Sequence, residues 1–363
     1  MTAIDTLNRS NADAGTATTG AALGRTPDDK AMLRAAADLP RDLLVPRAGI
    51  YWPDFLASAL VGYVAMAVAI LSASLPVTLA AGLLAVFALY RAAGFIHELT
   101  HLRPGMLPGF RAAWNLIIGI PLLIPSFMYE DVHTHHHAKT RYGTVEDPEY
   151  LPLALMKPWS LPLFIVAALL APVALLFRFA VLTPLSLVIP PLRRQVVAAY
   201  SGLAINPAYR RRPPEGAFRH MWLWQEAGAS LWAIGLLTAS ALYGWRPLLV
   251  GMAIFSGIAV VNQLRTLVAH LWENEGEPMT VTGQYLDSVN VPPPDIFSPL
   301  WAPVGLRYHA LHHLLPSMPY HSYGEAHRRL VTALGLESTY MQASHPGLFV
   351  LVGRIARSTM GRR

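Results

Sequence analysis

The chain has 363 residues, of which 53% are hydrophobic and only 14% are charged, whereas an average soluble domain has about 25% charged residues. This composition argues against an ordinary cytosolic protein, and the long uncharged runs predict one membrane-embedded unit. The 28 basic residues only modestly exceed the 22 acidic ones, so we expect a membrane surface and no nucleic-acid partner. The absence of cysteine excludes disulfides, thiolate metal sites and cysteine nucleophiles.

The apolar stretches follow one another as two predicted hairpins with broken segments between them. Residues 55–90 carry no charge and contain a turn with serine and proline, which predicts two spanning helices. Residues 112–129 are slightly short for a span, so we expect a re-entrant or interfacial segment there. Residues 158–192 contain many prolines, which predict a broken hairpin that dips into the membrane without crossing it. Residues 227–245 and 247–264 predict the second hairpin.

These segments predict an all-α integral membrane fold with four transmembrane helices as two hairpins, re-entrant or interfacial helices and a cytoplasmic histidine-rich cap. Residues 1–47 are expected to be a flexible cytoplasmic tail, residues 48–335 the membrane domain and residues 336–363 a basic cytoplasmic segment. The loop at residues 193–219 is rich in arginine, and such loops collect in the cytoplasm. We therefore expect a multi-pass protein of the cell inner membrane, with its histidine clusters and both termini in the cytoplasm.

Nine of the 14 histidines occur in four stretches near the ends of the predicted membrane segments. Within three stretches the spacings are three and four residues, which brings the imidazoles onto one helical face. Nine imidazoles are too many for one metal ion and suit two. The predicted metal ligands are His97, His101, His133, His136, His137, His270, His309, His312 and His313.

Residues 97–101 read H-E-L-T-H, which also matches the zinc-protease pattern H-E-x-x-H with Glu98 as general base. A membrane-embedded zinc protease would leave most of the clustered histidines without a role. A nitrogen-rich shell in apolar surroundings instead favours iron used with dioxygen on a lipid C–H bond. The protease and a non-catalytic metal carrier remain alternatives of a different class.

Three histidine motifs carry a resemblance to a known family: H-x-x-x-H at residues 97–101, and H-x-x-H-H at residues 133–137 and again at residues 309–313. In this order they resemble the histidine boxes of the integral-membrane fatty acid desaturase and hydroxylase superfamily. The strings E-D-P-E after the second motif and H-L-L-P in the third look most like bacterial fatty acid desaturases. The resemblance covers about residues 50–335 and implies two iron ions held by nine histidines, His270 being the ligand after the fourth span.

The resemblance implies desaturation of a fatty acyl chain that depends on O2 and electrons. Hydroxylation or ketolation of a lipid, alkane or carotenoid by the same boxes stays open. We expect membrane lipid around the chain, no fused electron-transfer domain, and a separate ferredoxin, rubredoxin or cytochrome with its reductase as electron donor. Zinc can replace iron in overexpressed protein.

Other side chains are expected to support the metal ligands, because metal-bound imidazoles usually donate their second N–H to a carboxylate or carbonyl. The supporting residues predicted near the metals are Glu98, Asp147, Thr266 and Asn262. Some relatives place Asn four residues before the extra histidine, where it holds a metal-bound water; here Thr266 stands there. Trp301 and Tyr308 are expected at the substrate entrance. No catalytic residue is expected beyond the metal ligands.

Overall fold

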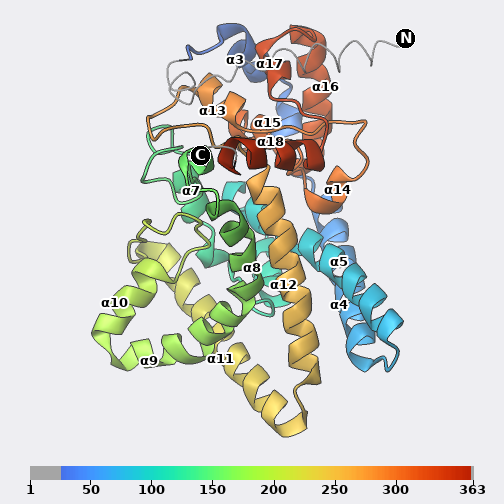
Figure 1. Ribbon diagram of the computed structural model, residues 1–363, viewed down its shortest axis with the longest axis vertical. Coiled ribbons are helices and arrows are strands. Elements are labelled where there is room, and N and C mark those ends of the chain that lie inside the picture. The colour runs from blue at the N-terminus through green and yellow to red at the C-terminus, as the bar shows by residue number, and fades with distance from the viewer. Residues whose placement is uncertain (1–25, 361–363) are drawn as a thin grey trace.

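The computed structural model describes residues 26–360, and the regular elements within that range are all helices. Figure 1 shows two levels: long helices extend from a cap of short helices and loops. The first and last described helices, α3 (Lys30–Ala37) and α18 (Leu348–Met360), both belong to the cap. The expected all-α membrane architecture is confirmed.

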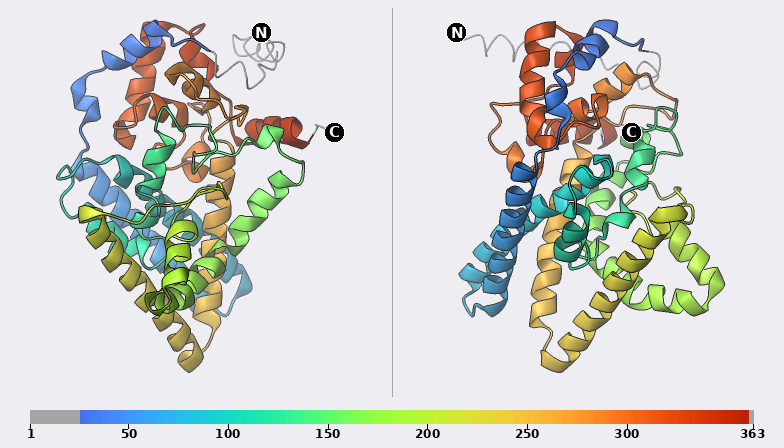
Figure 2. Two further views of the ribbon diagram at one scale, coloured as in Figure 1. Left: turned by 90° about the vertical axis from the view of Figure 1, so that its left-hand side faces the viewer. Right: turned by 180° about the vertical axis from the view of Figure 1, so that it is seen from behind.

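Four helices are long and apolar enough to cross a membrane, judged by length and composition. They are η1 with α4 (Arg41–Leu71), α5 (Leu75–His101), α8 with η5 and α9 (Ser160–Val188), and α12 (Arg246–Leu267). The expected number of spanning helices is therefore confirmed. Their far ends lie at the side of the molecule opposite the cap (Figure 2).

The first expected hairpin consists of α4 (Ala48–Leu71) and α5, which pack along each other. Gly62 permits the close approach, because a Cβ atom there would lie 2.6 Å from the side chain of Leu89. Arg91 donates two hydrogen bonds of 2.7 and 2.6 Å to the carboxylate of Asp54. This pairing fixes the part of α5 that leads to the first histidine motif.

The third candidate span differs in detail from the expected broken segment. It comprises α8 (Ser160–Phe177), the π-helical turn η5 (Arg178–Leu182) and α9 (Thr183–Val188), after which α10 (Pro190–Ala199) turns back toward the cap (Figure 1). A continuous helix forms because Pro172 is accommodated inside α8 and Pro184 lies at the start of α9. Residues 160–188 are thus long enough to cross, where we expected a segment that only dips into the membrane.

The second expected hairpin is formed by α11 (Gly216–Tyr243) and α12. α11 is not among the four candidate spans of the described residues, because its first turns are polar. Its buried Glu226 accepts hydrogen bonds of 2.7 Å from both Arg178 and Arg193. These ion pairs tie α11 to η5 and α10.

Between α5 and the cap helices the chain forms only short helices, and the re-entrant or interfacial placement expected for residues 112–129 stays a prediction. These are α6 (Phe110–Trp114), η2 (Asn115–Gly119) and η3 (Ser126–Met128). The helices of the cap are α3, α7 (Val132–His136), η4 (Leu153–Leu155), α13 (Val281–Asp287), α14 (Ser298–Trp301), α15 (His309–Leu314), η6 (Tyr320–Ser322), α16 (Tyr323–Leu334), α17 (Thr339–Gln342) and α18.

The described N-terminal segment is packed against the cap. Met32 and Ala36 of α3 are buried in one cluster with Leu311 and Ala326, and the backbone N–H of Asp29 donates to Thr282 Oγ1 at 2.8 Å. The folded part therefore begins before residue 48, where we expected its boundary. The remainder of the expected tail, residues 1–25, lies outside the described residues, as do residues 361–363.

Candidate metal centre

All nine predicted ligands meet in the cap, although they come from four separate parts of the chain. They are supplied by the end of α5, by α7 and the residue after it, by the segment after α12, and by α15. In each of two groups, one nitrogen from every imidazole lies within 4.8 Å of the others. The first group is His97, His101, His133, His137 and His312; the second is His136, His270, His309 and His313.

The ring nitrogens of each group converge. In the first group, His137 Nε2 lies 3.0 Å from His133 Nε2 and 2.8 Å from His312 Nε2. In the second, His309 Nε2 lies 3.0 Å from His270 Nε2 and 3.2 Å from His313 Nε2. A pair of facing nitrogens can share only one proton, so lone pairs are left pointing at a common centre.

Some ring nitrogens of the two groups have no hydrogen-bond partner although they are buried. They are both nitrogens of His97, Nε2 of His101, and Nδ1 of His309 and His313. Leaving buried polar atoms without partners is costly. A cation at the first centre would engage His101 Nε2 and one nitrogen of His97, whereas in the second group the nitrogens that face one another are the Nε2 atoms and not the unpartnered Nδ1 atoms of His309 and His313.

The two groups are neighbours. The ring of His137, in the first group, lies with its centroid 4.4 Å from that of His313, in the second. Burial lowers the pKa of His312 and of His313 well below the usual value, so these rings are neutral at pH 7 and available as ligands. The arrangement fits two adjacent metal ions held by neutral imidazoles.

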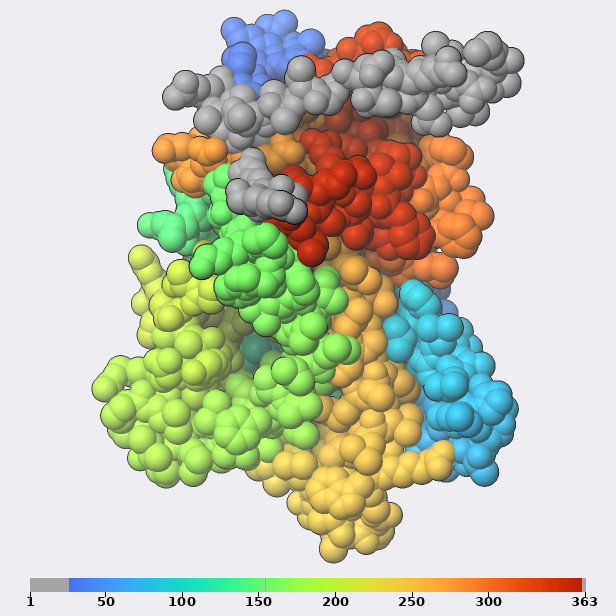
Figure 3. All heavy atoms as spheres, in the orientation of Figure 1, coloured from blue at the N-terminus to red at the C-terminus, as the bar shows by residue number. Residues whose placement is uncertain are grey.

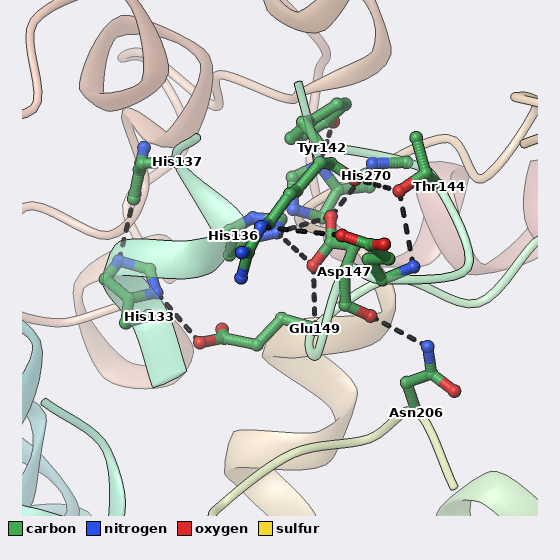
Figure 4. Close-up of polar contacts among 12 residues, drawn as sticks. His133, His136, His137, Tyr142, Thr144, Asp147, Glu149, Asn206 and His270 are labelled. Carbon is green, nitrogen blue, oxygen red and sulfur yellow. Dashed lines mark hydrogen bonds and ion pairs between the residues drawn. The ribbon is translucent and has the colours of Figure 1, made fainter. Parts of the chain in front are cut away.

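Carboxylates hold the outward-facing nitrogens of two rings on α7 (Figure 4). Glu149 Oε1 lies 2.9 Å from His133 Nδ1, and Asp147 Oδ1 lies 2.9 Å from His136 Nδ1. Burial alone would lower the pKa of His136, but the Asp147 carboxylate raises it above the usual value. Burial also raises the pKa of Glu149 to about 7. These contacts fix the ring orientation, so that Nε2 of each ring is left for a metal ion.

Tyrosine hydroxyls hold two further rings. Tyr142 Oη lies 2.9 Å from His270 Nδ1 and donates to Asp287 at 2.8 Å, and Tyr323 Oη lies 2.8 Å from His312 Nδ1. Sequence reasoning missed these residues and Glu149. Only Glu149 had a local signal, its position two residues after Asp147.

Two carboxylates were predicted to support the histidines, and only one of them, Asp147, is hydrogen-bonded to a ring. Asp147 is fully buried and accepts hydrogen bonds from the backbone N–H groups of Gly143 and Glu149 at 2.9 and 2.8 Å. Glu98 lies 3.9 Å from His97 Nδ1, too far for a hydrogen bond. Its carboxylate instead accepts from Tyr51 Oη and from the backbone N–H of Tyr320.

A cavity of about 670 Å³ begins at His97 and runs between α5, α8 and α12. It is lined mostly by aliphatic and small side chains, and Figure 3 shows the surface hollowed beside α8. Asn262 and Thr266 line this cavity. Trp301 and Tyr308 are not among its lining residues: the Trp301 carbonyl accepts a hydrogen bond from Tyr90, and Tyr308 lies against the ring of His327.

The comparison with known families agrees with this geometry. A family model described as fatty acid desaturase matches residues 71–344, which contain all nine histidines. The chain belongs to the fatty acid desaturase family. It is also similar to a protein of Caulobacter vibrioides (strain NA1000 / CB15N) named ceramide hydroxylase, with 49% identity over 337 residues, 92% of this chain and 96% of that protein.

Membership of the fatty acid desaturase family confirms the resemblance drawn from the histidine motifs. The chain is an oxidoreductase of lipid metabolism in the desaturase and hydroxylase superfamily. The zinc-protease alternative loses its support, because Glu98 is engaged by Tyr51 and Tyr320. Seven further histidines also gather around His97 and His101 in the two groups.

Proposed function

We propose that the protein is a membrane-bound di-iron hydroxylase that acts on a ceramide-type lipid, an N-acylated sphingoid base. The observation that carries this proposal is the 49% identity, over nearly the whole of both chains, to the protein named ceramide hydroxylase. It favours insertion of oxygen over the desaturation suggested by the histidine motifs. Desaturation of the same lipid is the competing outcome.

Two iron ions would be held by the five histidines of the first group and the four of the second. When bound, iron in such a shell supplies dioxygen activation: O2, a pair of electrons and a pair of protons convert C–H into C–OH and water. The protein holds the rings rigid through Asp147, Glu149, Tyr142 and Tyr323. It also keeps water from the reacting carbon, because the cavity beside His97 is mostly apolar.

The electrons must come from outside the cavity, and we propose a separate ferredoxin, rubredoxin or cytochrome with its reductase. We further propose that the cap faces the cytoplasm and that the long helices lie in the inner membrane. The arginine-rich loop at residues 193–219 supports this orientation.

Lipid analysis of cells that supply ceramide and express the chain with a reductase and carrier tests the function. We expect ceramide that has gained one oxygen atom, which is absent from cells expressing His312→Ala. Loss of two hydrogen atoms would instead establish a desaturase. Unchanged lipids, after electron transfer to the purified protein has been demonstrated, would contradict both assignments.

The depth of the cavity predicts the chain length that is accepted. Ala171 lines the cavity on α8, and Ala171→Trp would fill space that a long alkyl chain needs. We expect turnover of the longest ceramides to fall about tenfold or more while shorter ones are still used, as measured by product chain-length profiles. Ala174→Trp, an exposed position on the same helix, is the control; equal profiles for both variants would contradict this path for the chain.

A further inference from the structure

The cavity beside the metal centre reaches the surface of the molecule on one side of α8. Most of its lining side chains are buried or half-buried, and the exposed ones are Met156, Trp159, Leu163, Ala167, Pro207 and Asn262. Five of these six belong either to the beginning of α8 and the residues before it or to the segment at residues 203–207, which lines the cavity opposite them. The hollow in Figure 3 lies on this side, between α8 and the yellow-green part of the chain.

Toward the cap the same cavity is closed. Its lining residues Tyr90, Tyr129 and Leu306 are buried, as is His97, and Glu149 is half-buried. An alkyl chain that reaches the histidines along this cavity therefore passes between α8 and residues 203–207. We call this gap the side opening.

The side opening begins at the level where a membrane would end. The third candidate span starts at Ser160, and Lys157 and Trp159, just before it, are both exposed. Tryptophan and lysine at the end of a span are typical of the interface between lipid headgroups and hydrocarbon. Leu163 lies about one turn further along α8, so the opening continues from the interface into the apolar layer.

A row of apolar side chains connects the side opening with the interior of the cavity. Trp159, Leu163, Ala167, Ala171 and Leu175 all line the cavity and follow one another at intervals of four residues. Side chains at this spacing are neighbours on a helix. The small alanine side chains leave space beside α8, and the row offers an alkyl chain an apolar surface all the way from the membrane.

The opposite side of the opening is fixed to the loop that supports the metal ligands. The backbone N–H groups of Ile205 and Asn206 donate to the carbonyl of Pro148, each at 3.0 Å. The side-chain amide of Asn206 donates to the carbonyl of Asp147 at 2.9 Å. The side opening is thus held in place relative to Asp147, whose carboxylate orients one of the histidine rings.

We propose that the substrate enters sideways from the membrane through the side opening, between residues 156–167 and residues 203–207. This inference rests on the proposed function and specifies it. The substrate is a lipid dissolved in the leaflet next to the cap, not an acyl group delivered through water on a soluble carrier. Its alkyl chain moves from one apolar environment into another, so no methylene group has to cross water.

Lipid capture by the purified full-length protein in bilayer nanodiscs tests the side opening without turnover. The chain has no cysteine, so Leu163→Cys can be coupled with pyrene maleimide before ceramide with a diazirine in its alkyl chain is added to the bilayer. Irradiation then cross-links the ceramide that has entered, and mass spectrometry measures cross-links to residues 258–266 of α12. We expect the pyrene adduct to lower these cross-links by about tenfold or more.

Two controls use the same chemistry. Leu163→Cys that carries only a methylthio group should capture ceramide like the wild type. Val166→Cys with the pyrene adduct should do so too, because Val166 is exposed on α8 but does not line the cavity. Equal capture by the two pyrene adducts would overturn the side opening. Should Leu163→Cys not fold, Pro207→Cys, exposed on the opposite side of the opening, decides in the same way.

The order of addition distinguishes a blocked opening from a filled cavity. When ceramide is bound first and pyrene maleimide is added afterwards, we expect the bound lipid to be retained on dilution, because the adduct closes its exit. Displacement of the lipid would show that the adduct only fills the cavity and would overturn the proposal. Capture of the same diazirine chain from water as its coenzyme A thioester, unaffected by the adduct at residue 163, would also overturn it.

These outcomes are distinguishable from failure of the proposed function. Capture of ceramide that the adduct blocks, without oxygenated lipid in cells, would refute the hydroxylase and keep the side opening. Hydroxylation of ceramide by a protein whose capture is insensitive to the adduct would keep the hydroxylase and refute the side opening.

Discussion

His312→Ala is expected to abolish turnover and to lower bound metal below two ions per chain. His312 Nε2 faces His137 Nε2 at 2.8 Å, and its ring also lies with its centroid 4.3 Å from that of His97. Removing its ring takes one ligand from the first group. The loss of metal affinity and activity should therefore exceed the ~10–100-fold effect that is typical when a ligand loses its outer hydrogen-bond partner. Metal content by mass spectrometry and product formation by lipid analysis measure both effects.

His220→Ala is the matched control, because His220 is exposed on α11 and belongs to neither group. It should keep wild-type metal content and turnover. Retained activity in His312→Ala would refute the assignment of the third histidine motif. The identity of the metal must be measured after loading with iron, since zinc binds such nitrogen sites more tightly than ferrous iron.

Asp147→Asn is expected to weaken metal binding by about 10–100-fold with little change in volume. Asp147 lies 2.9 Å from His136 Nδ1 and also accepts from the N–H groups of Gly143 and Glu149. The asparagine amide turns its NH2 group toward one of these N–H donors, and two donors cannot form a hydrogen bond with each other. Competition with an iron chelator measures the affinity.

Glu146→Gln provides the comparison for this variant. Glu146 adjoins Asp147, but its side chain is 70% exposed and pairs with Arg141 at a distance of 3.6 Å. Surface pairs of this kind contribute little, so affinity and turnover should stay at wild-type levels. Equal loss in both variants would mean that residues 146–147 act through loop folding and not through His136.

The convergence of the nine histidines was the most predictable part of the molecule. Spacings of three and four residues bring imidazoles together on short helices such as α15, and this local geometry needs no knowledge of the rest of the chain. The grouping of His270 with His309 and His313 was less local. That grouping was not predicted: the sequence indicated only that His270 belongs with the other ligands, because the end of a span fixes the membrane depth of the residue that follows it.

Side chains that hold the rings were harder to predict, because they come from distant segments. Tyr142 contacts His270 and Asp287 across more than a hundred residues of sequence. The residues next to Tyr142 in the sequence do not distinguish it from the other tyrosines, so this contact could not be predicted. The same reason explains why Trp301 and Tyr308, chosen as aromatics near the third motif, do not line the cavity while Arg265 does.

The membrane helices were predictable in number but not in every boundary. Hydropathy identifies α4, α5 and α12 directly, whereas the prolines of residues 158–192 argued against a continuous helix. The buried ion pairs of Glu226 with Arg178 and Arg193 explain how α11 holds a carboxylate inside the protein. From sequence alone, a charged residue in a buried ion pair cannot be distinguished from a charged residue at the solvent-exposed surface.

The order of synthesis along the chain determines when both histidine groups can be complete. Met32 and Ala36 remain uncovered until residues 311–326 have been synthesised, because these segments share one buried cluster. The last histidines, His312 and His313, also leave the ribosome only after every membrane helix has been made. Metal can therefore bind to both complete groups only after nearly the whole chain has been synthesised. A truncated chain that ends before residue 309 lacks part of both groups. Such a fragment lacks the complete set of histidines, so any metal chemistry is withheld until the fold that surrounds both groups exists.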